Sequence, residues 1–287
     1  MWRTNCIDRI TQFWVRVSGR KIKLSDASWL QGPIGNSSVI ADDWLGEEAE
    51  RRGAVLAEGM GLLPDMAQLQ ATDFDPSQLA AEVVSFYQDT AEWSMEVSHE
   101  WSRAALPAGW VLSRLFTNRL QQLNFPLGSA KVANRITSRV VSLVSEDGDP
   151  IGVAWMRTLP ATGQYVYSGW YGTATLPGSV RPCLRVVFPL PNGSLMVFLR
   201  PEARSDGALI LESPKGKFGE PGAYLVVAPP DEGFLWARRI PIYERFVVGV
   251  SDGGDLYTDH DLRIWNIPVI RFNYRLKHRS KRPIDRE

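Results

Sequence analysis

The spacing of apolar residues changes about halfway along this chain of 287 residues. In residues 1–135, apolar positions recur every three or four residues, which is typical of amphipathic helices. From about Ser138 onward they alternate with other residues, which is typical of β-strands. The pattern predicts an α+β protein, with a helical N-terminal part packed on a C-terminal antiparallel β-domain.

The first part contains segments with clear helical spacing, after a basic and irregular extension over residues 1–42. Within that extension, residues 5–18 predict a short basic amphipathic helix. Asp75 and Pro76 suit the start of a longer helix that continues through the nineties and carries His99. A further helix is expected to end at Pro126.

The second part, residues 136–280, predicts about eleven short strands joined by tight turns such as Asp147-Gly148. No repeat of fixed length suggests a propeller. A run of hairpins without intervening helices favours a closed antiparallel barrel of lipocalin-like type, or a strongly curved sheet. Residues 281–287 are a basic tail. The expected strands are 140–145, 150–159, 164–174, 183–190, 194–200, 208–213, 223–228, 234–240, 245–250, 255–265 and 268–276.

Two of these strands are apolar on both faces. In residues 183–190 and 194–200, the odd and the even positions both carry large apolar side chains. Such strands are covered on both sides, so arginines in the strands of this β-domain need partners. The arginines are Arg157, Arg185, Arg200, Arg238 and Arg239.

Two interpretations of these arginines remain open. They reach water near strand ends and pair with Glu202, Glu212 or Glu244, or one or two of them bind a carboxylate, phosphate or polarised carbonyl inside an apolar cavity. The strand over residues 164–174 supports a cavity. Tyr165, Tyr167 and Tyr171 share one face with a glycine between them, and Trp170 lies on the other.

The candidate acid–base chemistry centres on His260, which stands between Asp259 and Asp261. A histidine beside carboxylates can act as a general acid or base. Strand alternation places both aspartates on the face opposite His260, which favours a role at a turn or strand end over catalysis. The candidate ligand-binding residues are Arg157, Tyr165, Tyr167, Trp170, Tyr171, Arg200, Glu202, Arg238, Asp259 and His260.

Composition limits the alternatives. The net charge is zero, but both chain ends are basic, and residues 42–58 are acidic. No apolar run approaches the roughly 20 residues needed to span a bilayer. Two distant cysteines provide no disulfide framework, so a cytoplasmic location is expected. No metal-binding, phosphate-loop or dinucleotide motif occurs, so no cofactor and no specific nucleic acid is predicted.

Several stretches together resemble an uncharacterised bacterial protein family that is frequent in actinobacteria. They include FYQDTAEWSMEV, QQLNFPL, VVFPLPNGS, DGALILESP and FGEPGAY. The resemblance covers roughly Trp44 to Leu276 and implies no particular activity.

Three functional hypotheses follow. The first is a binding protein for an apolar small molecule, such as a lipid, isoprenoid or polyketide, held in the β-domain with arginine and tyrosine contacts. The second is a cofactor-free cyclase or isomerase that uses the same pocket. The third is a peripheral protein whose basic termini make weak contact with an anionic membrane surface.

Overall fold

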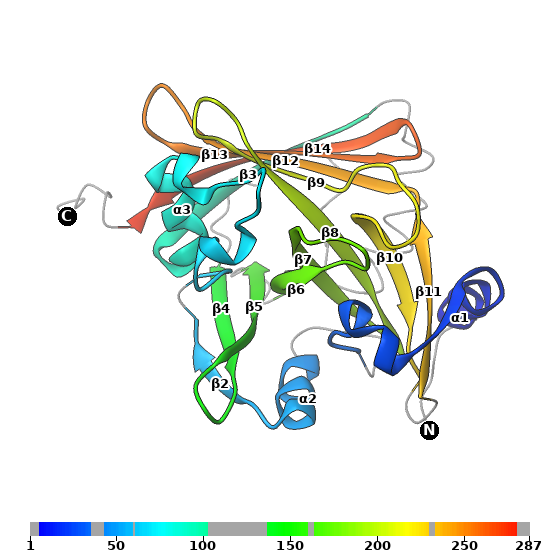
Figure 1. Cartoon of the computed structure of the whole chain (residues 1–287). Helices are drawn as coiled ribbons and strands as arrows, with labels where there is room; N and C mark the ends of the chain where they lie inside the picture. The colour runs from blue at the N-terminus through cyan, green and yellow to red at the C-terminus, as the bar shows by residue number, and fades with distance from the viewer. Residues whose placement is uncertain are drawn as a thin grey trace.

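The computed structural model describes residues 6–35, 43–59, 61–102, 137–159, 164–229 and 233–279. Within these ranges the protein is mostly β, with one antiparallel sheet of 14 strands and three short α-helices (Figure 1). The helices are α1 (Cys6–Ser18), α2 (Asp43–Arg52) and α3 (Ala81–Gln88). The strands are β1 (Arg20–Lys23), β2 (Val55–Glu58), β3 (Trp93–Trp101), β4 (Thr137–Val144), β5 (Pro150–Leu159), β6 (Gln164–Thr175), β7 (Pro182–Leu190), β8 (Gly193–Ala203), β9 (Leu209–Glu212), β10 (Gly222–Val227), β11 (Phe234–Ile240), β12 (Ile242–Val250), β13 (Leu256–Ile264) and β14 (Ile267–His278).

The sheet branches at β8. One edge of β8 pairs with β7, whereas the other edge pairs with β10 through its first half and with β9 through its second half. The main path runs β2-β4-β5-β6-β7-β8-β9-β12-β13-β14-β3, and the side branch runs β10-β11-β1. Within the described ranges β2 and β3 do not pair, so the sheet is not closed, and the expectation of a barrel was wrong.

The two halves of the main path lie opposite each other. Figure 1 shows β9, β12, β13 and β14 across the top of the view, with β4 to β7 below them and α3 beside the space between. The first core cluster fills this interior, with Leu184, Val186, Leu195 and Val197 among its buried members.

A second core lies on the outer face of β4 to β8 and β10. There Trp170, Met196 and Phe198 pack against Trp29 and Trp44, which come from the chain segments that cover this face. The prediction that β7 and β8 are covered on both faces is therefore confirmed.

The half formed by β12, β13, β14 and β3 has a different outer face, which is charged. Cross-strand pairing places alternating charges opposite one another along one row. Opposite charges that face each other across strands stabilise a sheet modestly and disfavour shifted pairing. The row consists of Glu212, Arg245, Asp261, Arg271 and Glu100.

All eleven strands expected after residue 136 are present, and their ends agree to within three residues. The helix expected from Asp75 through the nineties was wrong. Asp75 caps only a short 3₁₀ turn by accepting a hydrogen bond from the Ser77 amide, α3 ends at Gln88, and β3 follows. The segment WSMEVSHEW alternates large and polar residues, and pairing with β14 decides in favour of a strand.

Three further expectations concern the basic helix at the N-terminus, the helix that ends at Pro126 and the division of the chain at residue 135. Residues 6–18 form the expected amphipathic helix α1, which ends at Ser18, and the Gly19 amide then donates to the Val15 carbonyl. The helix expected to end at Pro126 lies outside the described residues. The division of the chain at residue 135 stays a prediction, although β1, β2 and β3 all precede it and belong to the sheet.

Candidate ligand-binding site

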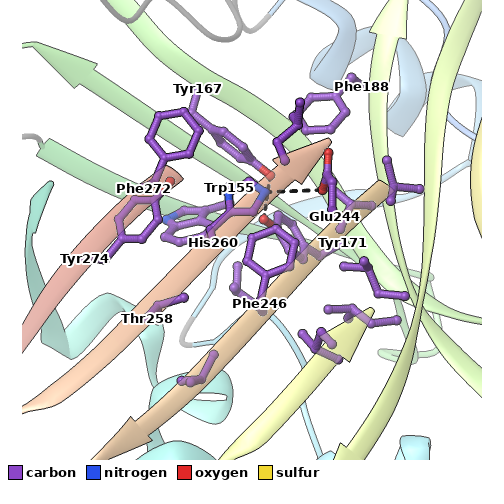
Figure 2. Close-up of a pocket in the computed structure, with 18 of the residues that line it drawn as sticks. Trp155, Tyr167, Tyr171, Phe188, Glu244, Phe246, Thr258, His260, Phe272 and Tyr274 are labelled. Atoms are coloured by element: carbon purple, nitrogen blue, oxygen red, sulfur yellow. Dashed lines mark hydrogen bonds and ion pairs between the residues drawn. The ribbon is translucent and has the colours of Figure 1, made fainter. Parts of the chain in front are cut away.

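A cavity of about 190 Å³ lies between the two halves of the sheet. Inward-facing side chains of β5 to β8 form one wall, and side chains of β12, β13 and β14 form the opposite wall (Figure 2). α3 adds Phe86 and Tyr87, and β3 adds Met95 and Trp101. Most lining residues are aliphatic or aromatic with a few polar groups among them, which is typical of a site for a small molecule.

His260 is held in this wall by stacking on both sides. It lies opposite Phe246 of β12 and Phe272 of β14, with ring centroids 3.8 Å and 5.3 Å away. Burial lowers the pKa of His260 to about 3, Asp261 opposes this shift, and Arg157 adds to it. The imidazole is therefore neutral at physiological pH.

Glu244 lies beside His260. Oε2 of Glu244 is 3.7 Å from Nε2 of His260, which is longer than a hydrogen bond (Figure 2). The Glu244 side chain is 16 % exposed, and burial raises its pKa to about 7. Because desolvation disfavours the charged form of both groups, the pair is largely uncharged just below neutral pH.

Tyr167 and Tyr171 meet on the opposite wall. Their hydroxyl oxygens are 2.5 Å apart, and Gly169 lies between them, where an added Cβ would come 3.0 Å from the Tyr167 hydroxyl. Burial raises the pKa of both phenols, for Tyr171 to about 12. Both tyrosines are therefore neutral at neutral pH.

Arg157 is the cation of the cavity. Arg157 is only 6 % exposed. Its guanidinium carbon lies 3.7 Å, 4.7 Å and 5.7 Å from the ring centroids of Trp155, Tyr167 and Tyr274. Aromatic faces attract such a cation. Its Nε makes no hydrogen bond within the described ranges.

This arrangement combines a buried cation with a carboxyl group that can exchange a proton near pH 7. The chemistry it can perform is therefore binding of a polar group, or proton transfer by Glu244, inside an apolar enclosure. Across the described part of the chain, no three His, Cys, Asp or Glu side chains gather as metal ligands do.

The structure brings four predicted site residues together at the cavity: Arg157, Tyr167, Tyr171 and His260. Trp170 lies on the opposite face of β6, in the second core, as its alternation predicted. The side chain of Tyr165 lies outside the described residues. His260 stands in the middle of β13, not at the expected turn or strand end.

The other four candidates lie away from the cavity lining. Arg200 is part-exposed, 3.7 Å from Glu212, which matches the water-facing alternative for the strand arginines. Glu202 and Asp259 are exposed. Arg238 donates a hydrogen bond to the Ser18 carbonyl and lies over the Trp14 ring, so it holds α1.

The sequence reasoning missed Glu244 as a site residue and considered it only as a partner for arginines. Its neighbours at alternate positions are Ile242, Phe246 and Val248, so it is a single charge on an otherwise apolar strand face. That pattern was available in the sequence. Thr258 and Tyr274, which also line the cavity, carried no such signal.

The fold and the site together define an open, strongly branched antiparallel β-sheet protein with an internal apolar cavity that holds ionisable groups. The chain is distantly homologous to the uncharacterized membrane protein YndJ of Bacillus subtilis, with 25% identity over 255 residues. This match covers 87% of the chain but only 44% of YndJ, so the chain spans less than half of that relative's length.

The expected resemblance to an uncharacterised bacterial protein is confirmed at this distance. No protein-family profile and no solved structure matches the chain. Among the described residues, none of the helices has the length and apolar character required to cross a bilayer.

Proposed function

We propose that this protein binds a small apolar molecule in the cavity between the two halves of its sheet. The observation that carries the proposal is the cavity itself, an apolar enclosure of about 190 Å³ with Arg157, Glu244 and His260 in its lining. An engineered apolar cavity of about 150 Å³ in another protein binds benzene. The ligand's apolar part therefore has roughly the size of one aromatic ring or a short lipid, isoprenoid or polyketide fragment.

The test compares a cavity variant with a surface variant. Val248→Phe adds a ring inside the cavity, whereas Val180→Phe adds one at a residue that is 90% exposed. Calorimetric titration with benzyl alcohol should show binding to the wild type and to Val180→Phe, and none to Val248→Phe. Native mass spectrometry of protein from its own host should show a bound molecule. An apo mass and no binding of benzyl alcohol to the wild type would overturn the proposal.

An enzyme is the second candidate, and Glu244 favours it. A carboxyl group with a pKa of about 7 in an apolar enclosure is suited to act as general base and then as general acid. A cofactor-free isomerase or cyclase needs such a group within reach of its substrate. If the protein is an enzyme, the molecule that copurifies should be converted to an isomer, and Glu244→Gln should abolish this conversion while it retains binding. A carrier would bind the molecule without converting it.

Membrane contact is a third candidate, supported by α1. Ile10, Phe13, Trp14 and Val17 lie at helical spacing and are all exposed, whereas Val15 is buried and anchors the helix on the protein. The arginines and lysines of residues 9–23, in α1 and just after it, are also exposed. An apolar face flanked by cations suits the surface of an anionic bilayer.

This candidate also has a direct test, sedimentation with phosphatidylglycerol vesicles. The wild type should bind, Phe13→Ser should bind several-fold less, and phosphatidylcholine vesicles should bind little of either protein. Equal recovery with both lipids would contradict the role of charge. A cytoplasmic location, which the sequence predicts, is likewise a proposal.

A further inference from the structure

The cavity contains a cation without a matching anion. Among the described residues, no carboxylate lies within ion-pair distance of the Arg157 guanidinium, and its partners are the aromatic rings around it and the Tyr274 hydroxyl, with which it hydrogen-bonds. A buried charge without an opposite charge is costly, even when aromatic faces offset part of that cost. A ligand that brings the missing anion would therefore gain more from this site than a neutral molecule of equal size.

The other titratable groups facing the cavity do not compensate Arg157. Tyr87 from α3, Tyr167 and Tyr171 from β6 and Tyr274 from β14 stay neutral, because burial raises the pKa of each phenol. His260 is neutral because burial lowers its pKa. Glu244 is the one carboxyl group in the lining formed by the described residues, and it is mostly protonated below pH 7. Below that pH the lining therefore carries one net positive charge.

Polar groups that could take part in hydrogen bonds to a ligand lie near this charge. The Arg157 Nε and the His260 Nε2 are both buried and make no hydrogen bond among the described residues. The hydroxyls of Tyr167 and Tyr171 bond to each other, so one of the two protons is available for a further acceptor. The planar guanidinium of arginine matches a carboxylate, with two parallel hydrogen bonds.

We propose that the ligand is a small monocarboxylate, with its apolar part in the cavity and its carboxylate on Arg157. This inference rests on the proposed binding function and adds the chemical class of the polar end. A short-chain fatty acid or an aromatic acid has the required size and charge. Ionised Glu244 repels such a ligand, so binding is tighter at pH 6 than at pH 8.

The first part of the test uses matched pairs of probes with the wild-type chain, and the second part uses two variants. Calorimetry at pH 6 compares benzoate with benzyl alcohol and hexanoate with 1-hexanol. Each carboxylate should bind at least about tenfold more tightly than its alcohol, the effect of one charge-assisted hydrogen bond. Arg157→Gln should remove this preference while alcohol binding persists, and Arg200→Gln on the outer face should change neither.

The outcomes separate the two proposals. Alcohols that bind as tightly as their carboxylates would overturn the anionic ligand and leave the apolar binding function intact. If none of the four probes binds, the binding function itself is overturned. A preference for carboxylates that survives Arg157→Gln would show that another group holds the anion, and would overturn the role of Arg157 as its partner.

Discussion

The two halves of the sheet both line the cavity with one face, but their outer faces differ. Strands β5 to β8 are buried on both faces, with one core toward the cavity and a second core beneath α2. Strands β12 to β14 face the cavity on one side and water on the other, and their outer face carries a charged row. The first half is thus a rigid two-sided wall, and the second is a one-sided wall.

This difference has a consequence for the polar groups. In the two-sided wall, Arg157 and the tyrosine pair lie on strands fixed by packing on both faces. In the one-sided wall, strand alternation places Glu244 and His260 in the cavity, while their neighbours in sequence, such as Asp261, are on the outer face. A shift of one residue would exchange the two sets.

The largest effect is expected for a matched pair of phenylalanine truncations, one in each half of the sheet. Phe198→Ala removes a ring that is fully buried between Trp29 and Tyr224 in the second core, so it should lower the free energy of unfolding by about 3–5 kcal/mol. Phe246→Ala removes a half-buried ring beside an existing cavity and should cost clearly less. Urea denaturation measures both. Equal losses would mean that the two walls are packed alike.

A second test concerns the buried carboxyl. The folded-state pKa of Glu244 is raised from 4.5 to about 7, so the folded protein binds more protons than the unfolded chain between these values. Stability from this group therefore falls as pH rises from 4.5 to 7. Glu244→Gln mimics the protonated carboxyl. Its free energy of unfolding relative to the wild type should therefore rise across that window, by up to about 3 kcal/mol at pH 7 and above.

His260 changes the stability with pH in the opposite direction. Its folded-state pKa is lowered to about 3, so the wild type loses stability as pH falls below 6.5. The two trends oppose each other in the wild type, and the difference between wild type and Glu244→Gln isolates the carboxyl. Glu212→Gln, on the outer face, is the control and should show little pH-dependent difference. A flat difference for Glu244→Gln would show that its carboxyl is well solvated.

Much of the fold could be predicted from the sequence, since a period of two and turn residues such as Asp147-Gly148 depend on local chemistry. The strand β3 could not, because apolar spacing in residues 79–95 also fits a helix, and only pairing with β14 selects the strand. That the sheet stays open and does not form a barrel was unpredictable for a related reason. Local pattern gives strands and hairpins, but the pairing of β8 with both β9 and β10 is long-range.

The candidate site could be predicted in part. Tyr167 and Tyr171 were found because they share one strand face with a glycine between them, and Arg157 because a charge within a strand of this domain needs a partner. Arg200 and Glu202 show the same pattern near the end of β8, where water is accessible. Sequence alone does not give the depth of a strand position. Glu244 could have been found as a single charge on an otherwise apolar strand face, but its raised pKa depends on burial, which the sequence does not give.

The smallest test addresses the charged row on the one-sided wall. Arg271 donates from Nε to Oδ1 of Asp261 at 2.6 Å, and both side chains are part-exposed. A double-mutant cycle with Arg271→Gln and Asp261→Asn should give a coupling free energy of about 0.2–1 kcal/mol, because water and salt screen exposed pairs. The coupling should shrink in 1 M NaCl. A larger, salt-independent coupling would mean that this face is covered, as the outer face of β5 to β8 is. A small coupling would mean that the row fixes the strand register more than it adds stability. A shifted register would break the alternation of charges in this row and turn Glu244 and His260 out of the cavity.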